Sequence, residues 1–394
     1  MENNNLKNYL MEFPNYLSMF LFSFFMMLTS PILLDISKYF NVPPENMNLI
    51  ITFFLIGEAT GILALMFLSR KFDRSNIVIW IYILVIPTLV GLILTSSLTL
   101  FYILYFISGC LFGIIFMNGN LSMLEGKVKN KDSIINLGHG FFAIGALTSP
   151  FIASSLINRQ MNWRILYIIA IGLVLISFIS HLLVNKKQAS SLKAKEIIPI
   201  RETFRYRSKN IYMMFTAIMM LFYVMSEVTI FSWAPTFFRV EKLFDLYSAS
   251  IIVSVFWIGI LIGRLIISFL SYKFKAGNLL MALSIISLIG LILTIFPVSQ
   301  KINFIGAGLI GLGFSGIPPL LISSSGRIFG SGRDLSLTIL FVVGSTSGSI
   351  IPFIISLLAD YSFLFSMVIA IIFMVIFFIF VIIRKNYRKT LKAK

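Results

Sequence analysis

The stretch FLIGEATGILALMFLSRKFDRSN, residues 54–76, returns 202 positions later as FWIGILIGRLIISFLSYKFKAGN, residues 256–278. Eleven of the 23 paired positions are identical, where a chain of this composition would give about two or three by chance. The same offset pairs Gly109 with Gly311. Because the same offset of 202 residues recurs in separate regions, the sequence predicts two copies of a single folding unit.

The composition is typical of a chain that is embedded in a lipid bilayer. Hydrophobic residues make up 58% and charged residues 12%, and the mean hydropathy is +0.96. Apolar runs of about 20 residues recur along the chain, each long enough to cross ~30 Å of hydrocarbon as a helix. Barrel strands would alternate over about 10 residues, and the sequence has no such alternation. Cys110 is the single cysteine, so neither a disulfide framework nor a thiolate metal cluster is expected.

Twelve apolar segments have the length and composition of transmembrane helices. They are residues 14–36, 47–69, 77–96, 98–123, 134–157, 163–185, 211–236, 248–271, 278–297, 303–325, 335–358 and 362–383. The first is too long for the apolar part of a signal peptide, so we predict that it is retained. The fold class is therefore an all-α membrane protein with 12 transmembrane helices in two pseudo-symmetric six-helix bundles. The predicted domains are 1–185 and 211–394.

The basic residues predict the orientation of these helices. With the N-terminus in the cytoplasm, 25 Lys and Arg fall on the cytoplasmic side and six on the opposite side. Because cytoplasmic loops are enriched in Lys and Arg, both termini are predicted to be cytoplasmic. The same enrichment accounts for the net charge of +17 without nucleic-acid binding. We expect a multi-pass protein of a bacterial plasma (inner) membrane.

Residues 186–210 form the one long polar interruption, and they contain eight Lys and Arg. We predict a basic cytoplasmic linker that lies on the anionic inner leaflet. Docking of a partner protein on this segment is the alternative.

Twelve helices, a repeat of six and a basic central loop resemble the major facilitator superfamily. The loop LSRKFDRSN, residues 68–76, resembles a degenerate form of the motif between that superfamily's second and third helices, D-R-x-G-R-R. Arg70 stands at the usual Asp position and Asp73 at the usual Gly position, so the charge-relay role of the motif does not carry over residue by residue. Arg70 and Asp73 are predicted to serve gating or structure.

Four segments resemble the fucose–galactose–glucose:proton symporter branch of that superfamily. They are YVMSEVTIFSWAPTFF (223–238), FWIGILIGR (256–264), LGHGFFAIGALTSP (137–150) and GLGFSGIPPLL (311–321). The branch uses an Asp in helix one and a Glu in helix four for proton coupling and sugar binding. Pro31 and Phe116 align with them here, so neither role carries over.

Two carboxylates inside predicted helices are the candidates for proton coupling. An ionisable side chain in mid-membrane is energetically costly, so its presence there indicates a function. Glu227 lies ~24 Å into the helix 211–236 at 1.5 Å per residue, and helix seven lines the central cavity in the resembling superfamily. Glu227 is also a candidate for binding solute. Glu58 sits near the middle of its helix. For each, a carboxylate that only bonds two helices together is the alternative.

Polar and aromatic side chains within the helices are the candidates for solute contacts. Asn118 and Asn120 offer both donors and acceptors, as a hydroxyl-rich solute requires. Tyr223 and Trp233 could form an aromatic platform for a sugar, although Trp233 could equally be an interfacial anchor.

Other residues are predicted to serve gating or structure. Arg264 could reach an acid across the halves or extend to the lipid headgroups, and His139 could sense pH or pack beside its glycine neighbours. A proline inside a helix removes a backbone donor and bends the helix. The prolines predicted to kink helices are Pro150, Pro352, Pro318 and Pro319.

We predict a secondary active transporter that moves a small polar solute, most simply a sugar or related metabolite, by alternating access with proton symport. The expected partners are the solute, H⁺ and the lipid bilayer, with no nucleic acid, and the expected state is a monomer. The sequence shows no enzyme motif, and no cofactor or metal is expected with His139 and His181 as the only histidines. An exporter of amphipathic compounds and a transport-dead receptor or scaffold are the alternatives.

Overall fold

The computed structural model describes residues 8–43, 47, 49–127, 131–188, 207–296, 299–329, 333–359 and 363–393. Those residues fold as helices and short connections, without a β-strand. The chain forms two compact units, Met1–Ile197 and Ile198–Lys394. Most of the predicted linker 186–210 lies outside the described residues, because they stop at 188 and resume at 207.

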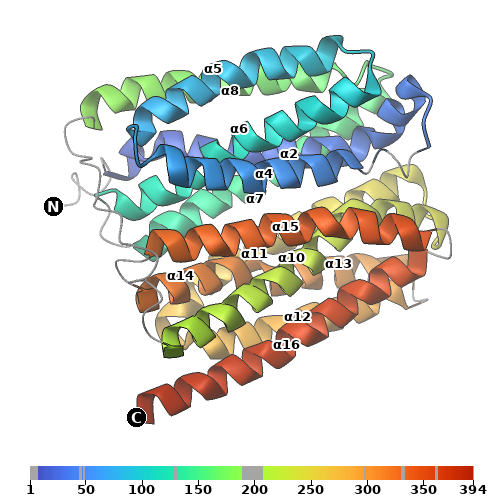
Figure 1. Ribbon diagram of the computed structural model, residues 1–394. Helices are drawn as coiled ribbons and strands as arrows, with labels where there is room; N and C mark the ends of the chain where they lie inside the picture. The colour runs from blue at the N-terminus through green and yellow to red at the C-terminus, as the bar shows by residue number, and fades with distance from the viewer. Residues whose placement is uncertain are drawn as a thin grey trace. The chain divides into compact units, whose positions relative to one another are not determined.

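The helices of each unit run side by side (Figure 1). Unit 1 contains α2 (Phe13–Phe40), α4 (Leu49–Leu68), α5 (Arg74–Leu94), α6 (Leu98–Glu125), α7 (Lys131–Asn158) and α8 (Ile165–Gln188). Unit 2 contains α10 (Arg207–Val240), α11 (Leu246–Lys273), α12 (Ala276–Ile295), α13 (Gln300–Ser315), α14 (Ile317–Phe329), α15 (Arg333–Ala359) and α16 (Phe363–Ala393).

These helices occupy the twelve predicted transmembrane segments. Among the described residues, ten helical segments are long and apolar enough to span a bilayer, and α2 is an eleventh if its two bent halves count as one span. The remaining predicted segment, 335–358, lies in α15, which holds a shorter apolar helix, Leu335–Ile351. The predicted fold class is confirmed.

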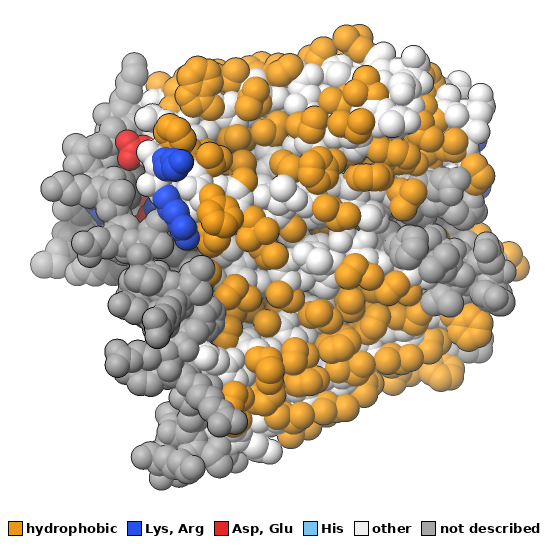
Figure 2. Space-filling model, in the orientation of Figure 1, with side chains coloured by type: hydrophobic (Ala, Val, Ile, Leu, Met, Phe, Trp, Pro, Cys, Tyr) orange, Lys and Arg blue, Asp and Glu red, His pale blue; other side chains and the backbone are white. Residues whose placement is uncertain are grey.

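The outward side chains of the helices are apolar. Large residues such as Trp80, Phe151 and Phe269 are 66%, 70% and 75% exposed. Hydrophobic side chains cover much of the face drawn in Figure 2, and the charged ones drawn there gather near one end. Apolar surface on this scale is expected for helices that are solvated by lipid.

Glycines let paired helices touch at the backbone in both units. Gly109 on α6 lies against the carbonyl of Phe54 on α4. The repeat-related Gly311 on α13 lies against the carbonyl of Phe256 on α11. A methyl group at either glycine would overlap that oxygen. The sequence repeat is therefore a repeated helix–helix contact, of the kind that small residues allow in membranes.

We expect Gly109→Ala and Gly311→Ala each to destabilise the protein by about 1–3 kcal/mol, because an inserted methyl group must push two helices apart. Thermal unfolding of the purified protein in detergent measures the change. Gly140→Ala is the matched control, since a Cβ there meets nothing within 4 Å. Equal unfolding temperatures for Gly109→Ala and Gly140→Ala would contradict the close approach.

Equivalent helix ends in the two units are capped by basic side chains that come from different positions in the repeat. Arg164 Nε donates to the Ile93 carbonyl at 2.7 Å, and Lys242 Nζ donates to the Ile295 and Phe296 carbonyls at 2.8 Å. Ile93 and Ile295 are 202 positions apart. A cation at a helix C-terminus complements the helix dipole. Partial burial lowers the pKa of Lys242 from its usual 10.5, and Glu241 opposes this shift.

Two of the four prolines predicted to kink helices lie inside a helix, and two lie at the start of one. Pro150 lies inside α7 and Pro352 inside α15, as expected. The tenth span is interrupted at Gly316, so Pro318 and Pro319 stand in the first turn of α14, where a missing N–H removes no helical hydrogen bond. A bend of 43° separates the halves Phe13–Thr29 and Pro31–Phe40 of α2, and Pro31 explains it.

Candidate functional site

The first candidate site is a polar cluster in unit 2 made of Tyr223, Glu227 and Arg264. Tyr223 and Glu227 are one turn apart on α10, so their side chains share a face. The Tyr223 hydroxyl donates to Glu227 Oε1 at 2.6 Å. Tyr223 is 1% exposed, whereas Glu227 is partly exposed. The carboxylate is thus held by a hydrogen bond from a buried tyrosine.

Arg264 brings a positive charge to this pair from the neighbouring helix α11. Its side chain is 6% exposed, and it interacts electrostatically with both Glu227 and Tyr223. Such burial does not fit an arginine that extends to the lipid headgroups. Aromatic rings hold the cluster in place: Phe314 packs against Tyr223 with ring centroids 5.3 Å apart, and Phe256 packs against Phe314 at 5.9 Å.

The polar cluster breaks the repeat. The positions equivalent to Tyr223, Glu227 and Arg264 in unit 1 are Leu21, Phe25 and Ile62. All three are apolar and at most 1% exposed. The same scaffold therefore folds in unit 1 with hydrocarbon in place of these polar groups. A structural requirement of the fold does not explain why unit 2 carries them.

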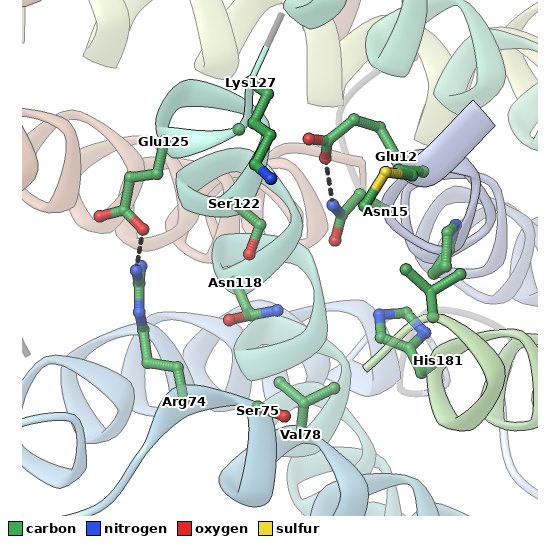
Figure 3. Close-up of a pocket in the computed structure, with 14 residues that line it drawn as sticks. Glu12, Asn15, Arg74, Ser75, Val78, Asn118, Ser122, Glu125, Lys127 and His181 are labelled. Carbon is green, nitrogen blue, oxygen red and sulfur yellow. Dashed lines mark hydrogen bonds and ion pairs between the residues drawn. The ribbon is translucent and has the colours of Figure 1, made fainter. Parts of the chain in front are cut away.

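The second candidate site is a pocket in unit 1, between the starts of α2 and α5 and the ends of α6 and α8. Its volume is about 90 Å³, which is room for a few water molecules. Figure 3 shows the side chains around it. The lining residues are Met11, Glu12, Pro14, Asn15, Arg74, Ser75, Val78, Asn118, Ser122, Glu125, Gly126, Lys127, His181 and Val184.

Charged and polar groups in this pocket are paired, in one case across two helices. Arg74 of α5 forms an ion pair with Glu125 at the end of α6 (Figure 3). Asn15 Nδ2 donates to Glu12 Oε2 at 2.6 Å. His181 Nδ1 lies 3.1 Å from the Ser177 carbonyl, and its Nε2 has no hydrogen-bond partner among the described residues. Water in the pocket can serve as that partner.

The two predicted asparagines face different surroundings. Asn118 lines the unit 1 pocket and is 6% exposed. Asn120 Nδ2 donates to the Phe116 carbonyl of its own helix at 3.0 Å and lies 3.7 Å from Met19 Sδ on α2. Asn120 is thus bonded within unit 1.

The remaining predicted residues do not belong to the polar cluster. Trp233 lies further along α10, and Glu58 and His139 lie in unit 1. Trp233 is buried on α10, about 9 Å further along the helix axis than Glu227. Glu58 is 6% exposed on α4, where its backbone packs against Gly109 and Gly113 of α6. His139 is 5% exposed on α7, with its ring 6.2 Å from that of Phe142.

The described ion pair at this loop is formed by Arg74, and not by the predicted residues Arg70 and Asp73. Arg70 and Asp73 are exposed in the turn between α4 and α5, with the Arg70 guanidinium 5.3 Å from the centre of the Phe67 ring. Arg74 is the residue that reaches Glu125.

Sequence reasoning missed Glu12, Glu125 and His181. Glu125 could have been found from the sequence, because Asn118, Ser122 and Glu125 have the i, i+4, i+7 spacing of residues on one helix face.

We expect Arg74→Gln and Glu125→Gln each to destabilise the protein by about 1–3 kcal/mol, since each leaves a poorly hydrated charge without its partner. The double variant should recover most of this loss. Thermal unfolding of the four proteins gives the coupling. Additive losses in the double variant would show that the two side chains do not interact.

Residues 16–332 match the sequence profile of the Major Facilitator Superfamily. The chain belongs to that superfamily. It is 25% identical over 370 residues to a protein named TsgA homolog from Buchnera aphidicola subsp. Baizongia pistaciae, with 92% of each chain covered. It is 23% identical over 318 residues to the TsgA homolog of Yersinia pestis (strain Pestoides F), covering 79% of this chain and 78% of that one.

The fold agrees with this membership. The crystal structure of the superfamily transporter FucP in its outward conformation superposes with a TM-score of 0.69 at 16% identity, covering 94% of this chain and 98% of FucP. The protein is therefore a multi-pass membrane transporter of the Major Facilitator Superfamily.

Proposed function

We propose that this transporter is a symporter that moves a small hydroxylated solute together with a proton by alternating access. Glu227 carries the proton. The solute contacts the side chains of Tyr223, Trp233, Asn118 and Asn120. Glu58 is the second candidate for a proton site. The protein acts as a monomer in a bacterial plasma membrane, with both termini in the cytoplasm and 186–210 as the linker between its bundles.

The observation that carries this proposal is the polar cluster of Tyr223, Glu227 and Arg264. Glu227 and Arg264 lie inside the spanning segments Asn210–Ala234 and Ile251–Ser271. Ionisable residues in such segments are rare, and they mark ion and proton pathways.

The cluster gives the proton a way to act on the helices. Ionised Glu227 accepts the hydrogen bond from Tyr223 and attracts Arg264 of α11. Protonation removes the charge, so both interactions weaken together. The contact between α10 and α11 then has two states that differ by one proton. A transporter needs a two-state element of this kind, because a ligand shifts an equilibrium only through different affinities for its states.

The proposal is tested with purified protein in vesicles that contain a trapped pH-sensitive dye. Glucose, fucose, gluconate or glucuronate is added outside under an inward proton gradient. The expected result is faster acidification of the lumen with at least one of these compounds, and none in protein-free vesicles. Flux of a labelled compound without proton movement would overturn symport. Extrusion of amphipathic dyes, with no response to the four compounds, would favour the exporter.

A further inference from the structure

We propose that the pocket in unit 1 binds uncharged hydroxyl groups of the solute, and that His181 and Asn118 are the side chains that bind them. This inference rests on the proposed function, in which Asn118 is already a solute contact. It adds His181 as a second contact and names the chemistry of the solute at this place. It follows from two buried polar side chains that line one cavity.

His181 presents a hydrogen-bond acceptor to the pocket. Its Nδ1 lies 3.1 Å from the Ser177 carbonyl. Because a carbonyl oxygen only accepts, Nδ1 carries the ring proton of the neutral imidazole, and Nε2 is an acceptor. The side chain is 6% exposed, and Nε2 has no hydrogen-bond partner among the described residues. A buried acceptor without a partner is energetically costly, so a ligand that donates a hydrogen bond is favoured there.

Three helices hold the His181 ring in place. Tyr82 of α5 packs against it with ring centroids 5.1 Å apart. The Tyr82 hydroxyl lies 2.7 Å from Ser177 Oγ on α8 and 3.1 Å from Ser18 Oγ on α2. Ser18, Tyr82 and Ser177 are at most 1% exposed. A side chain that is fixed in this way loses little conformational entropy when it binds a ligand.

Asn118 of α6 supplies both a donor and an acceptor to the same pocket, and Figure 3 shows it with His181 among the side chains around the cavity. It is 6% exposed. In the described part of the chain, no hydrogen bond joins its amide to another residue. Hydroxyl groups, like water, both donate to and accept from an amide. The cavity of about 90 Å³ has room for about three water molecules, or for hydroxylated carbons in their place.

The charges around the pocket favour a ligand without a net charge. Two carboxylates, of Glu12 and Glu125, and two cations, of Arg74 and Lys127, line it. Their formal charges sum to zero, and Arg74 and Glu125 form an ion pair. A charged ligand would disturb this balance and would meet a group of its own sign nearby, which costs energy. Uncharged hydroxyl groups avoid that cost.

The repeat shows that the helix scaffold does not require these two polar side chains. The positions equivalent to Asn118 and His181 in unit 2 are Leu320 and Ile383. Both are apolar, and they lie in the helices α14 and α16. Folding therefore does not explain the amide and the imidazole in unit 1, whereas binding of a ligand does.

The test measures binding of radiolabelled glycerol, fucose and glucose to the purified full-length protein by equilibrium dialysis. It is made near pH 8, where an imidazole is uncharged. At least one of the three compounds is expected to bind saturably. Glycerate and 3-amino-1,2-propanediol present the three carbons of glycerol with a negative or a positive charge. Each should compete with the bound compound at least tenfold more weakly than glycerol does.

Substitutions assign the binding to the pocket. His181→Asn keeps an amide N–H for the Ser177 carbonyl and removes the acceptor in the pocket, so Kd should rise about tenfold. His181→Gln places an amide oxygen near the position of Nε2 and should bind within about threefold of wild type. Asn118→Leu introduces the residue of the equivalent position and should also raise Kd about tenfold.

Thr60→Val on α4 is the control, because the Thr60 hydroxyl bonds the Ile56 carbonyl of its own helix and does not line the pocket. Its Kd should equal that of wild type. The comparison of His181→Asn with His181→Gln decides even if Asn118→Leu does not fold.

Three outcomes would overturn the inference: no saturable binding of any of the three compounds, competition by glycerate equal to that by glycerol, or unchanged binding in His181→Asn. If a solute moves protons in vesicles but its binding is the same in His181→Asn, proton symport stands and this inference is wrong. If binding depends on His181 and Asn118 and no proton moves with the solute, this inference stands and proton symport is wrong.

Discussion

Replacing Glu227 by glutamine is expected to lower proton-driven accumulation of the solute at least tenfold while leaving solute exchange nearly unchanged. Glutamine keeps the acceptor oxygen for the Tyr223 hydroxyl, and it has almost the same shape as glutamate. It cannot bind and release a proton. Exchange of labelled for unlabelled solute needs the binding site and the conformational change, but no net proton movement. The measurement compares uptake under a pH gradient with counterflow in the same vesicles.

Glu58→Gln is the matched control for this result. Glu58 is the other carboxylate predicted for coupling, and it is 6% exposed on α4 of unit 1. Normal accumulation in Glu58→Gln, together with loss in Glu227→Gln, assigns the proton to Glu227. The reverse pattern would move the coupling site to Glu58 and contradict the role of the unit 2 cluster.

The second large effect is expected for stability. Arg264→Gln should destabilise the protein by about 3 kcal/mol near pH 8, because it removes the buried cation that attracts ionised Glu227. It leaves Glu227 without the cation that stabilises its ionised form. The loss should shrink as the pH falls, since protonated Glu227 needs no counter-charge. Thermal unfolding over a pH series measures both effects.

The variant that carries both Arg264→Gln and Glu227→Gln completes a double-mutant cycle. The double variant Arg264→Gln with Glu227→Gln carries neither charge, so it should be more stable than Arg264→Gln alone near pH 8 and should not depend on pH in this way. Proton-driven accumulation should be lost in it, as in Glu227→Gln. If the double variant is as unstable as the sum of the single ones, the two side chains do not form a functional pair.

The fold was predictable because its information is local or periodic. Apolar runs mark the spans, and the offset of 202 residues marks the repeat. The structure explains the offset physically, since Gly109 and Gly311 make equivalent backbone contacts. Helix ends were less predictable. α16 continues to Ala393, ten residues beyond the predicted end, because hydropathy reports where the lipid ends and not where the helix ends.

The candidate site was predictable only in part. The cost of a charge in a membrane singles out Glu227 and Arg264 from the sequence. Their pairing depends on how α10 packs beside α11, which no local pattern encodes. The ion pair of Arg74 with Glu125 joins residues 51 positions apart and was missed for the same reason.

The most direct test of the account is the number of protons that enter with each solute molecule. It is obtained from a trapped pH dye and a labelled solute in the same vesicles. We predict a ratio near one for the wild-type transporter and near zero for Glu227→Gln. A ratio near one in both proteins would contradict the assignment of the proton to Glu227.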